Sequence, residues 1–418
     1  MSGGWSPERA EEYLLSLELF GMRFGLDRMR RLMTALDAPH RRFRSIHVVG
    51  TNGKSSTARM LAAILQAHGL RTGAYLSPHL VSFTERIRVD DADLDEAAFG
   101  AAVERAARAA ELVDRTLGEG DRVTQFEALT AAAYWELARR GVDVAVVEAG
   151  LGGRYDATSV IPSEVQVLTN VGLEHTRWLG PTITDVAREK LAVVRDDSTL
   201  VVGDLHPDAE REAVAAAECH GARLVHAPTE PPVPVAAPGS FQRANFALAA
   251  AGAEAFLGEL DPAALGRASR AVRVPGRFEV IDQRPLTVVD GAHNPAGARA
   301  LAASLPEALG GASPVIAVVS ILEDKDAAGI LRELLPSCAA AVLTRNVNPR
   351  ALPPATLQSL ATQLGADPAT LEIEPDPRRA LGRARELAGP DGAVVAAGSI
   401  YLVADLLRPA GARRASML

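Results

Sequence analysis

The chain has 418 residues, of which 48% are hydrophobic, and a formal net charge of −8. This length exceeds what one hydrophobic core normally encloses, so we expect two or three domains, and the negative charge argues against an extended nucleic-acid surface. No apolar run is long enough to cross a bilayer, and the N-terminus lacks the apolar core of a secretory signal, so a cytoplasmic protein is predicted. Cys219 and Cys338 have no ligand-like spacing and are expected to be free thiols.

Apolar strand-like runs alternate with alanine-rich helical stretches, which is the pattern of a parallel sheet covered on both faces. Proline and glycine interrupt both periods at 272–277, after which a second series begins. We therefore predict an α/β fold with a mainly parallel N-terminal domain (1–273), a hinge (274–278) and a Rossmann-like C-terminal α/β domain (279–418). The expected strands are Ser45–Gly50, Thr72–Leu76, Val142–Ala149, Val165–Val171, Thr199–Gly203, Phe278–Asp282, Thr287–Asp290, Val315–Ile321, Ala340–Arg345 and Val394–Ala397, and helical spacing marks Leu94–Leu117 and Phe126–Arg140.

The first strand runs into a phosphate-binding loop, since residues 46–56 read IHVVGTNGKSS. The two glycines let the backbone turn and approach a ligand closely, so that successive N–H groups and the start of a helix at 57–68 can face phosphate oxygens. The lysine adds a point charge, and one of the two serines can offer a hydroxyl to Mg²⁺. The expected ligand is a nucleoside triphosphate, which makes the first domain a P-loop ATPase domain; a tight turn with an incidental lysine is the alternative. The loop residues are Gly50, Thr51, Asn52, Gly53, Lys54, Ser55 and Ser56.

A second cluster follows the strand that ends at Glu148, where a glycine-rich turn contains Arg154. Ligands of open α/β sheets bind at the carboxyl ends of strands, so this carboxylate is well placed to hold Mg²⁺ opposite the phosphate loop. A solvated strand end is the alternative interpretation.

Polar residues also follow the next strand, namely Asn170, Glu174 and His175, and Lys190 comes on a later helix. They can share one edge of the sheet, although each alone is a weak signal, because a histidine in a loop or a lysine on an amphipathic helix is usually only a surface group.

The second domain places Asp290 and His293 at a strand end followed by a helix that starts with proline. These two side chains can face the nucleotide. Gln242 and Asn245, near the end of the first domain, offer amide groups of the kind an adenine edge needs, although they could equally be helix caps.

Taken in order, these motifs resemble the folylpolyglutamate synthase and dihydrofolate synthase family of the Mur ligase superfamily. The resemblance spans nearly the whole chain. The matching motifs, beyond those already given, are 12–14, 20–28, Ser77–Leu80, Glu85–Ile87, 126–130, Glu189–Lys190, Pro275–Arg277, 324–326 and Gly398–Ser399.

The resemblance implies an ATP-dependent ligase: ATP phosphorylates a substrate carboxylate, and the amino group of L-glutamate displaces phosphate from the acyl phosphate to form an amide. Lys54 and Mg²⁺ would lower the repulsion between carboxylate and triphosphate. Asp290 and His293 resemble contacts to nucleotide and acyl phosphate, Arg277 would approach the phosphates, and Gln242 and Asn245 resemble adenine-side contacts.

Two magnesium positions are implied by the same resemblance. One would use Glu148 with Ser55 or Ser56, and the other Glu148 with Ser77 and His175; imidazole is an atypical ligand for this hard cation. A monovalent cation is a further possible cofactor, although no motif indicates its site.

In the family, the lysine that matches Lys190 is often carbamylated by CO₂, which turns an ammonium into an anion able to help fix the metal. Leu191-Ala192 replaces the usual Ala-Gly after this lysine, and bulk at Leu191 weakens the expectation of carbamylation. Ser55 replaces a glycine common after the loop lysine, which leaves the choice of metal hydroxyl open. Phe241 and Val274 also depart from the family pattern, at positions that affect packing or adenine contact.

The acceptor is left open by these residues, because dihydropteroate and reduced folates would share every phosphate and metal group named. We favour a folate-directed ligase, acting on one or both, that works as a monomer with small-molecule substrates alone. The alternatives are a Mur-type ligase for another carboxylate, and a nucleotide-binding regulatory protein that has lost ligation. The 20–28 and 77–89 segments would distinguish the first alternative by shaping a pterin pocket.

Overall fold

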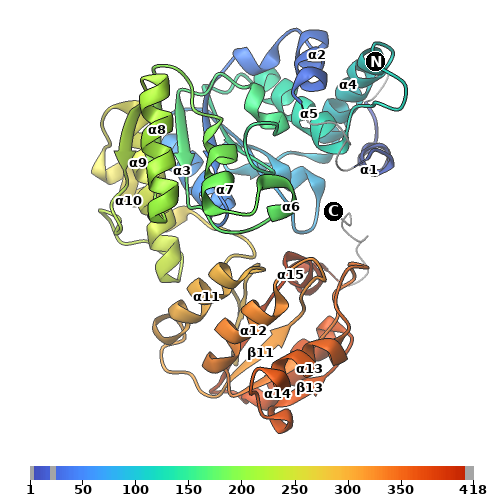
Figure 1. Cartoon of the computed structure of the whole chain (residues 1–418), viewed down its shortest axis with the longest axis vertical. Coiled ribbons are helices and arrows are strands. Elements are labelled where there is room, and N and C mark those ends of the chain that lie inside the picture. The colour runs from blue at the N-terminus through green and yellow to red at the C-terminus, as the bar shows by residue number, and fades with distance from the viewer. Residues whose placement is uncertain (1–3, 19–24, 410–418) are drawn as a thin grey trace. The chain divides into compact units, whose positions relative to one another are not determined.

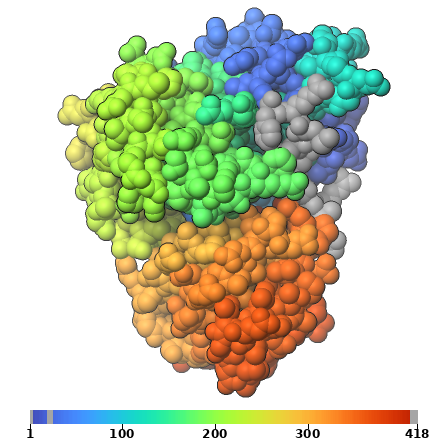
Figure 2. Space-filling model, in the orientation of Figure 1, coloured from blue at the N-terminus to red at the C-terminus, as the bar shows by residue number. Residues whose placement is uncertain are grey.

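The computed structural model describes residues 4–18 and 25–409, which divide into two compact units. The first holds the chain up to Ala236 together with Ala244–Val272, and the second holds Ala237–Arg243 together with the residues from Arg273 on. The predicted limits at 273 and 279 stay a prediction, but the contacts group part of the proline-rich 227–239 loop, and Gln242, with the second unit rather than the first. In Figure 2 the residues from Arg273 on are orange to red.

Unit 1 is built on an eight-stranded sheet in the order β4-β3-β2-β5-β1-β6-β7-β8. Pairing is parallel from β2 through β8, and β3 and β4 add an antiparallel edge. The central strands are buried along almost their whole length, as expected for a sheet covered on both faces. The strands are β1 Arg44–Val49, β2 Thr72–Tyr75, β3 Ile87–Val89, β4 Ala92–Asp93, β5 Val144–Glu148, β6 Val165–Leu168, β7 Thr199–Val202 and β8 Arg223–His226.

Helices cover both faces of this sheet. Helix α3 packs on β2 and β5 and against α10, α4 packs on α5, and α7 packs on α8, a pair that lies on the visible face in Figures 1 and 2. The helices are α1 Pro7–Ser16, α2 Asp27–Ala35, α3 Lys54–Ala67, α4 Glu96–Asp114, α5 Gln125–Arg140, α6 Thr176–Leu179, α7 Ile183–Leu191, α8 Pro207–His220, α9 Ser240–Leu257 and α10 Pro262–Ala271, with short 3₁₀ turns η1 Pro39–Arg41, η2 Phe83–Arg86 and η3 Ala157–Val160.

Unit 2 carries a six-stranded sheet in the order β13-β12-β11-β14-β10-β9, parallel except for the antiparallel edge strand β9. Pro295 opens α11, as the sequence predicts, and Asn294 caps it. The elements are β9 Glu279–Gln283, β10 Leu286–Val289, α11 Pro295–Ala308, β11 Val315–Val319, α12 Ala327–Leu334, η4 Leu335–Ser337, β12 Ala340–Leu343, α13 Pro354–Gln363, η5 Pro368–Thr370, β13 Leu371–Ile373, α14 Pro377–Ala388, β14 Ala393–Ala397 and α15 Ile400–Leu407.

The predicted α/β architecture is confirmed, and all the expected strands are present with ends that differ by no more than three residues. The helix expected at 57–68 is wrong at its start, because it begins at Lys54. Gly53 has a left-handed backbone with φ of 82° and ends the turn there, so the lysine and both serines lie in the first helical turn. Cys219 and Cys338 are free thiols, as predicted. None of the helices among the described residues is long and apolar enough to cross a membrane.

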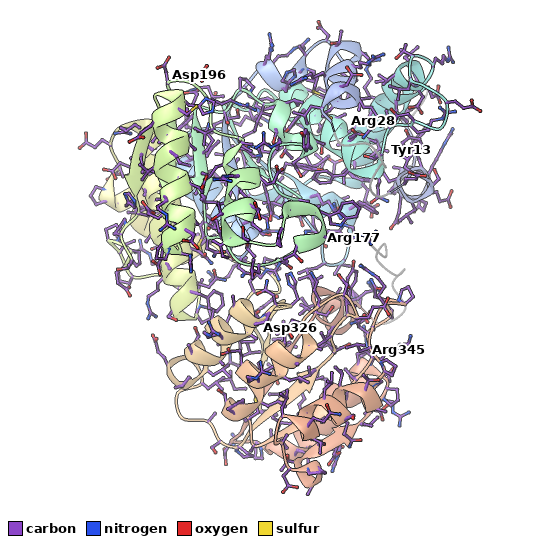
Figure 3. The ribbon with its side chains drawn as sticks, viewed as in Figure 1. Tyr13, Arg28, Arg177, Asp196, Asp326 and Arg345 are labelled. Carbon is purple, nitrogen blue, oxygen red and sulfur yellow. The ribbon has the colours of Figure 1, made fainter. Side chains whose placement is uncertain are left out.

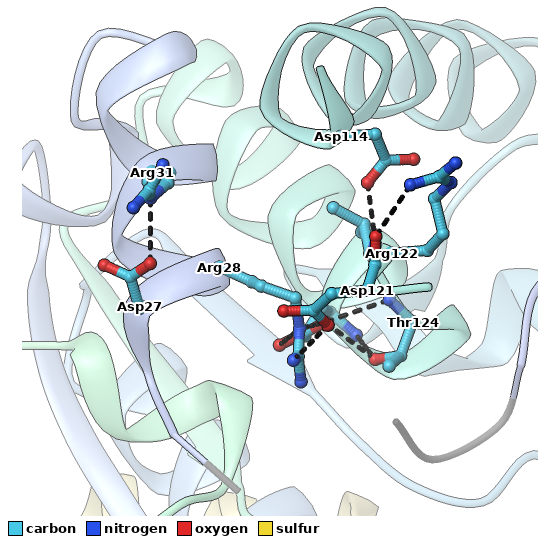
Figure 4. Close-up of polar contacts among 9 residues, drawn as sticks. Asp27, Arg28, Arg31, Asp114, Asp121, Arg122 and Thr124 are labelled. Carbon is cyan, nitrogen blue, oxygen red and sulfur yellow. Dashed lines mark hydrogen bonds and ion pairs between the residues drawn. The ribbon is translucent and has the colours of Figure 1, made fainter. Parts of the chain in front are cut away.

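A buried ion-pair cluster joins α2 to α5 (Figure 4), and Figure 3 labels its arginine, Arg28. The Nε of Arg28 donates to both carboxylate oxygens of Glu127 at 3.0 Å, and its Nη1 lies 2.9 Å from Asp121. Glu127 also accepts from the backbone N–H of Thr124, the cap of α5, so one carboxylate serves both the helix start and the guanidinium. All three ionic side chains are largely buried.

We expect Arg28→Met to lower the free energy of unfolding by roughly 3–5 kcal/mol, because it leaves two acids near each other without their cation. The matched control is Arg31→Met on the same helix, which removes an exposed pair to Asp27 and should cost less than about 1 kcal/mol. Urea denaturation of both variants tests this; equal losses would contradict a special role of the buried cluster.

Candidate active site

The phosphate loop connects the carboxyl end of β1 to α3. Neighbouring side chains fill the space that a residue larger than glycine would need at Gly50 and Gly53. A Cβ added to Gly50 would lie 1.9 Å from the Thr169 hydroxyl oxygen, and one added to Gly53 would lie 2.5 Å from the Asn245 Oδ1. Close approach therefore favours glycine at both positions, and so do their positive φ angles, 149° at Gly50 and 82° at Gly53. Asn245 is placed against this loop.

Glu148 lies at the carboxyl end of β5, opposite Val48 of β1 in the sheet register, and only 1% of it is exposed. The Ser55 hydroxyl donates to its Oε1 and the Ser77 backbone N–H donates to its Oε2, each at 2.9 Å. Ser56 is buried in the helix. Of the two serines left open by the sequence, Ser55 is the one in contact with the acid.

These groups suit Mg²⁺, because carboxylate and hydroxyl oxygens are the hard ligands this ion prefers. Within the described part of the chain, His, Cys, Asp and Glu side chains form no group of three or more that could hold a metal ion, so a magnesium site here would depend on serine oxygens and on water or substrate oxygens beside the one acid. His175 follows β6 with a left-handed backbone, its Nε2 3.9 Å from Glu174.

Lys190 is carried by α7, which starts with a capping box at Thr182, and its amine is buried under the phosphate loop. Its Nζ donates to the Gly50 carbonyl oxygen at 2.7 Å. Burial, reinforced by the nearby positive charge of Lys54, lowers the pKa of Lys190 from 10.5 to about 7. At neutral pH the amine is therefore partly uncharged, which an ordinary lysine is not.

The turn after β6 holds the phosphate loop from its other side. Thr169 donates from its hydroxyl to the Asn52 carbonyl oxygen at 2.6 Å, and Thr51 and Gly172 exchange two hydrogen bonds. The sequence interpretation missed Thr169, whose only signal is its place at a strand end next to Asn170.

Asp156 was also missed as an individual residue. It lies on the glycine-rich turn after Glu148, where Leu151 and Thr158 donate backbone N–H groups to its two oxygens, and burial raises its pKa. The Thr158 hydroxyl bonds both Asp156 and the Nε2 of the buried His47. The signal of Asp156 in the sequence is its place as an acid in the glycine-rich turn that follows Glu148.

In unit 2 the predicted residues also gather at one strand end. Asp290 follows β10 and accepts backbone N–H bonds from Phe278 and Ala292, each at 2.7 Å; burial raises the pKa of this carboxyl group. The Arg277 guanidinium packs over Gly291, and the Nδ1 of His293 lies 2.8 Å from the Gly291 carbonyl oxygen.

Gln242 is fully buried in unit 2, where its Nε2 donates to the Arg277 carbonyl oxygen at 3.1 Å. This places Gln242 beside Arg277, and Asn245 beside the phosphate loop of unit 1. The 20–24 part of the N-terminal segment that was expected to shape a pterin pocket lies outside the described residues.

Comparisons with known proteins point to one family. Residues 276–400 match the family model described as Mur ligase, glutamate ligase domain. The chain is 34% identical to the folylpolyglutamate synthase of Lacticaseibacillus casei, over 79% of this chain and 84% of that protein. It is 35% identical, over 95% of its length, to a probable bifunctional folylpolyglutamate synthase/dihydropteroate synthase of Haloferax volcanii, but spans only 49% of that protein.

Among solved structures, E. coli FolC in complex with DHPP and ADP is similar to this chain with a TM-score of 0.85 and 29% identity, covering 96% of this chain and 97% of that one.

Proposed function

Because the chain belongs to the folylpolyglutamate synthase and dihydrofolate synthase family, we propose that it is an ATP-dependent ligase that joins L-glutamate to the carboxylate of a folate or of dihydropteroate. The observation that carries this proposal is the grouping of the phosphate loop, Glu148, Ser55 and Lys190 at one edge of the unit 1 sheet. The ADP and DHPP bound to the similar E. coli structure support a nucleotide and an acceptor for this chain as well.

The ligation proceeds in two displacements. A carboxylate oxygen of the acceptor attacks the γ-phosphorus of ATP, ADP leaves, and an acyl phosphate forms. The amino group of glutamate then attacks the acyl carbon, phosphate leaves with the C–O electron pair, and the nitrogen loses a proton as the amide forms.

In this mechanism the residues of unit 1 bind and orient the triphosphate. The N-terminal N–H groups of α3 and the Lys54 ammonium, which donates to the Thr51 carbonyl oxygen at 3.2 Å in the structure, would face the phosphate oxygens and oppose their charge. Glu148 and Ser55 would hold one Mg²⁺, and Glu148 with Ser77 and His175, which lies in the turn after β6, would hold a second. When bound, Mg²⁺ would neutralise charge on the transferring phosphoryl group.

Residues of unit 2 complete the assignment. Arg277 is proposed to approach the phosphates, Asp290 to hold the nucleotide, and His293, whose Nδ1 lies 2.8 Å from the Gly291 carbonyl oxygen, to contact the acyl phosphate. Gln242 and Asn245 are proposed to contact the adenine of the nucleotide. The grouping of Arg277, Asp290 and His293 at the carboxyl end of β10 supports these roles.

We further propose that Lys190 is carbamylated. A lysine whose pKa is about 7 presents a substantial fraction of uncharged amine at neutral pH, and this is the form whose nitrogen attacks CO₂. The nitrogen loses a proton in that step, and the resulting carbamate carries a negative charge beside the proposed metal site.

Ser55 should matter for activity more than Ser56. We expect Ser55→Ala to lower kcat/KM for ATP about 10- to 100-fold, because the hydroxyl that touches Glu148 is lost from the metal position. Ser56→Ala, the matched control in the next position, should stay within about threefold of the parent, since that hydroxyl is buried in the helix. Steady-state phosphate release measures kcat/KM of both variants. Equal losses would contradict the assignment of Ser55, rather than Ser56, to the metal position.

The function itself is tested by phosphate release from ATP with Mg²⁺ and L-glutamate, comparing dihydropteroate, tetrahydrofolate and no acceptor, with mass spectrometry of the products. Addition of glutamate to one or both acceptors supports the proposal and identifies which synthase activity the chain has. If glutamate is added to neither acceptor, the proposed folate-directed ligation is overturned. A Mur-type ligase for another carboxylate or a regulatory nucleotide-binding protein would then be favoured. A monomeric state, a cytoplasmic location and a monovalent-cation requirement stay predictions, which light scattering, fractionation and a K⁺ titration test.

A further inference from the structure

The side-chain amide of Asn170 pairs with both backbone groups of Asn52 in the phosphate loop. The Asn52 N–H donates to Oδ1 of Asn170 at 3.0 Å, and Nδ2 of Asn170 donates to the Asn52 carbonyl oxygen at 3.2 Å. The two bonds close a ring between one side chain and one residue of backbone. They restrain the peptide planes on both sides of Asn52.

Other bonds hold the same stretch of loop against the turn after β6. The Thr51 N–H donates to the Asn170 carbonyl oxygen at 3.0 Å, and the Thr169 hydroxyl shares the Asn52 carbonyl oxygen with the Asn170 amide. Asn170 thus contacts two consecutive loop residues through both its backbone and its side chain. It is the most extensively bonded partner of the loop in this turn.

The direction of the Asn52 carbonyl decides where the next amide points. In a planar trans peptide the C=O and the N–H point in opposite directions, so a carbonyl oxygen held toward Thr169 and Asn170 turns the Gly53 N–H away from them. Gly53 is the cap residue of α3, where orphan N–H groups and the positive end of the helix dipole attract anions. The pairing therefore controls the orientation of an N–H at the proposed phosphate site.

We propose that Asn170 is a positioning residue that aims the Gly53 N–H at the phosphate chain of the bound nucleotide. The inference rests on the proposed function, since it presumes a nucleotide on this loop. An amide is required for this role because it offers one donor and one acceptor side by side. Aspartate has the same shape but would set a second oxygen against the Asn52 carbonyl oxygen, and leucine has neither group.

The experiment measures dissociation constants of Asn170→Asp and Asn170→Leu for ADP and for adenosine, which lacks phosphates. We expect ADP affinity to fall about 10-fold or more while adenosine affinity changes less than about twofold, because only the phosphates lose an aligned donor. In turnover, KM for ATP should rise by more than kcat falls. Asn170→Asp is nearly isosteric, so it keeps the test available if the leucine variant folds poorly.

The matched control is Gln166→Leu, which removes another buried amide, on β6 itself, whose Nε2 bonds Ser163 rather than the loop. It should leave the ratio of ADP to adenosine affinity unchanged. Equal weakening of both ligands by the Asn170 variants, or ADP affinity within twofold of the parent, would overturn this inference alone. Failure of the parent protein to bind ADP would overturn the proposed function together with it.

Discussion

Replacing Glu148 with glutamine should lower the rate of ligation by about a thousandfold or more, while leaving the fold intact. The side chain is buried at the end of β5 with a hydroxyl donor on one oxygen and a backbone N–H on the other. Glutamine keeps its shape but removes the negative charge that the proposed metal position requires. Loss of charge stabilisation at a transferring phosphoryl group commonly costs several orders of magnitude in rate.

Phosphate release under saturating ATP, Mg²⁺, glutamate and acceptor measures this effect, with thermal unfolding as the check on the fold. Glu164→Gln is the matched control, because Glu164 forms an exposed ion pair with Arg44 in the same unit. It should keep nearly full activity. If Glu148→Gln retained more than about a tenth of the rate, Glu148 would not be the principal metal ligand.

Lys190→Met should abolish ligation and yet stabilise the protein at neutral pH. Holding an ammonium in this buried position costs free energy, since its pKa falls from 10.5 to about 7, and that difference corresponds to roughly 5 kcal/mol. Methionine removes the cost and loses the bond to Gly50, worth about 1 kcal/mol. We expect a net gain of roughly 4 kcal/mol in CO₂-free buffer at pH 7 or below.

The sign of the pH dependence follows from the lowered pKa. Between about pH 7 and 10.5 the unfolded chain binds a proton at this lysine that the folded protein does not, so the parent gains stability as pH rises through that window. The advantage of Lys190→Met should therefore be largest at pH 7 or below and shrink toward pH 10. Urea denaturation across this range tests it, and a constant difference would contradict the lowered pKa.

Carbamylation of Lys190 can be measured by comparing the parent protein with Lys190→Met. With ¹³C-labelled bicarbonate, the parent should show a carbamate carbon signal that Lys190→Met lacks. A parent without the signal that is still fully active would remove carbamylation from the mechanism, while leaving the stability prediction untouched.

The core of the fold was predictable because its strands are continuous apolar runs between turn signals. The strands that escaped prediction, β3, β4, β8 and β13, are short, and most of them are edge strands. β4 is fully exposed and β8 is partly exposed along its length, so neither carries an apolar run. Pairing with a neighbour, rather than local pattern, creates them.

The parts of the candidate site that form local sequence motifs were predictable. They are the phosphate loop and Glu148, the acid at the end of a buried strand. The sequence left Ser55 and Ser56 as equals, because only the start of α3 at Lys54 turns one toward Glu148 and the other into the core. Burial lowers the pKa of Lys190, and Thr169 bonds the phosphate loop through its hydroxyl. Both effects depend on contacts between residues more than 100 positions apart in the chain, which no local pattern shows.

The central position of β1 in its sheet also has a consequence for synthesis. Groups from the turn after β6 and from α7 bond the loop after β1, and Asn245 of α9 lies against it, so residues translated between about 170 and 245 complete a feature encoded near residue 50. Such long-range closure is slow and comes late on the ribosome, where the chain emerges N-terminus first. ATP should therefore protect a nascent chain against proteolysis only after α9 has left the exit tunnel. Such protection would report that unit 1 is completely assembled.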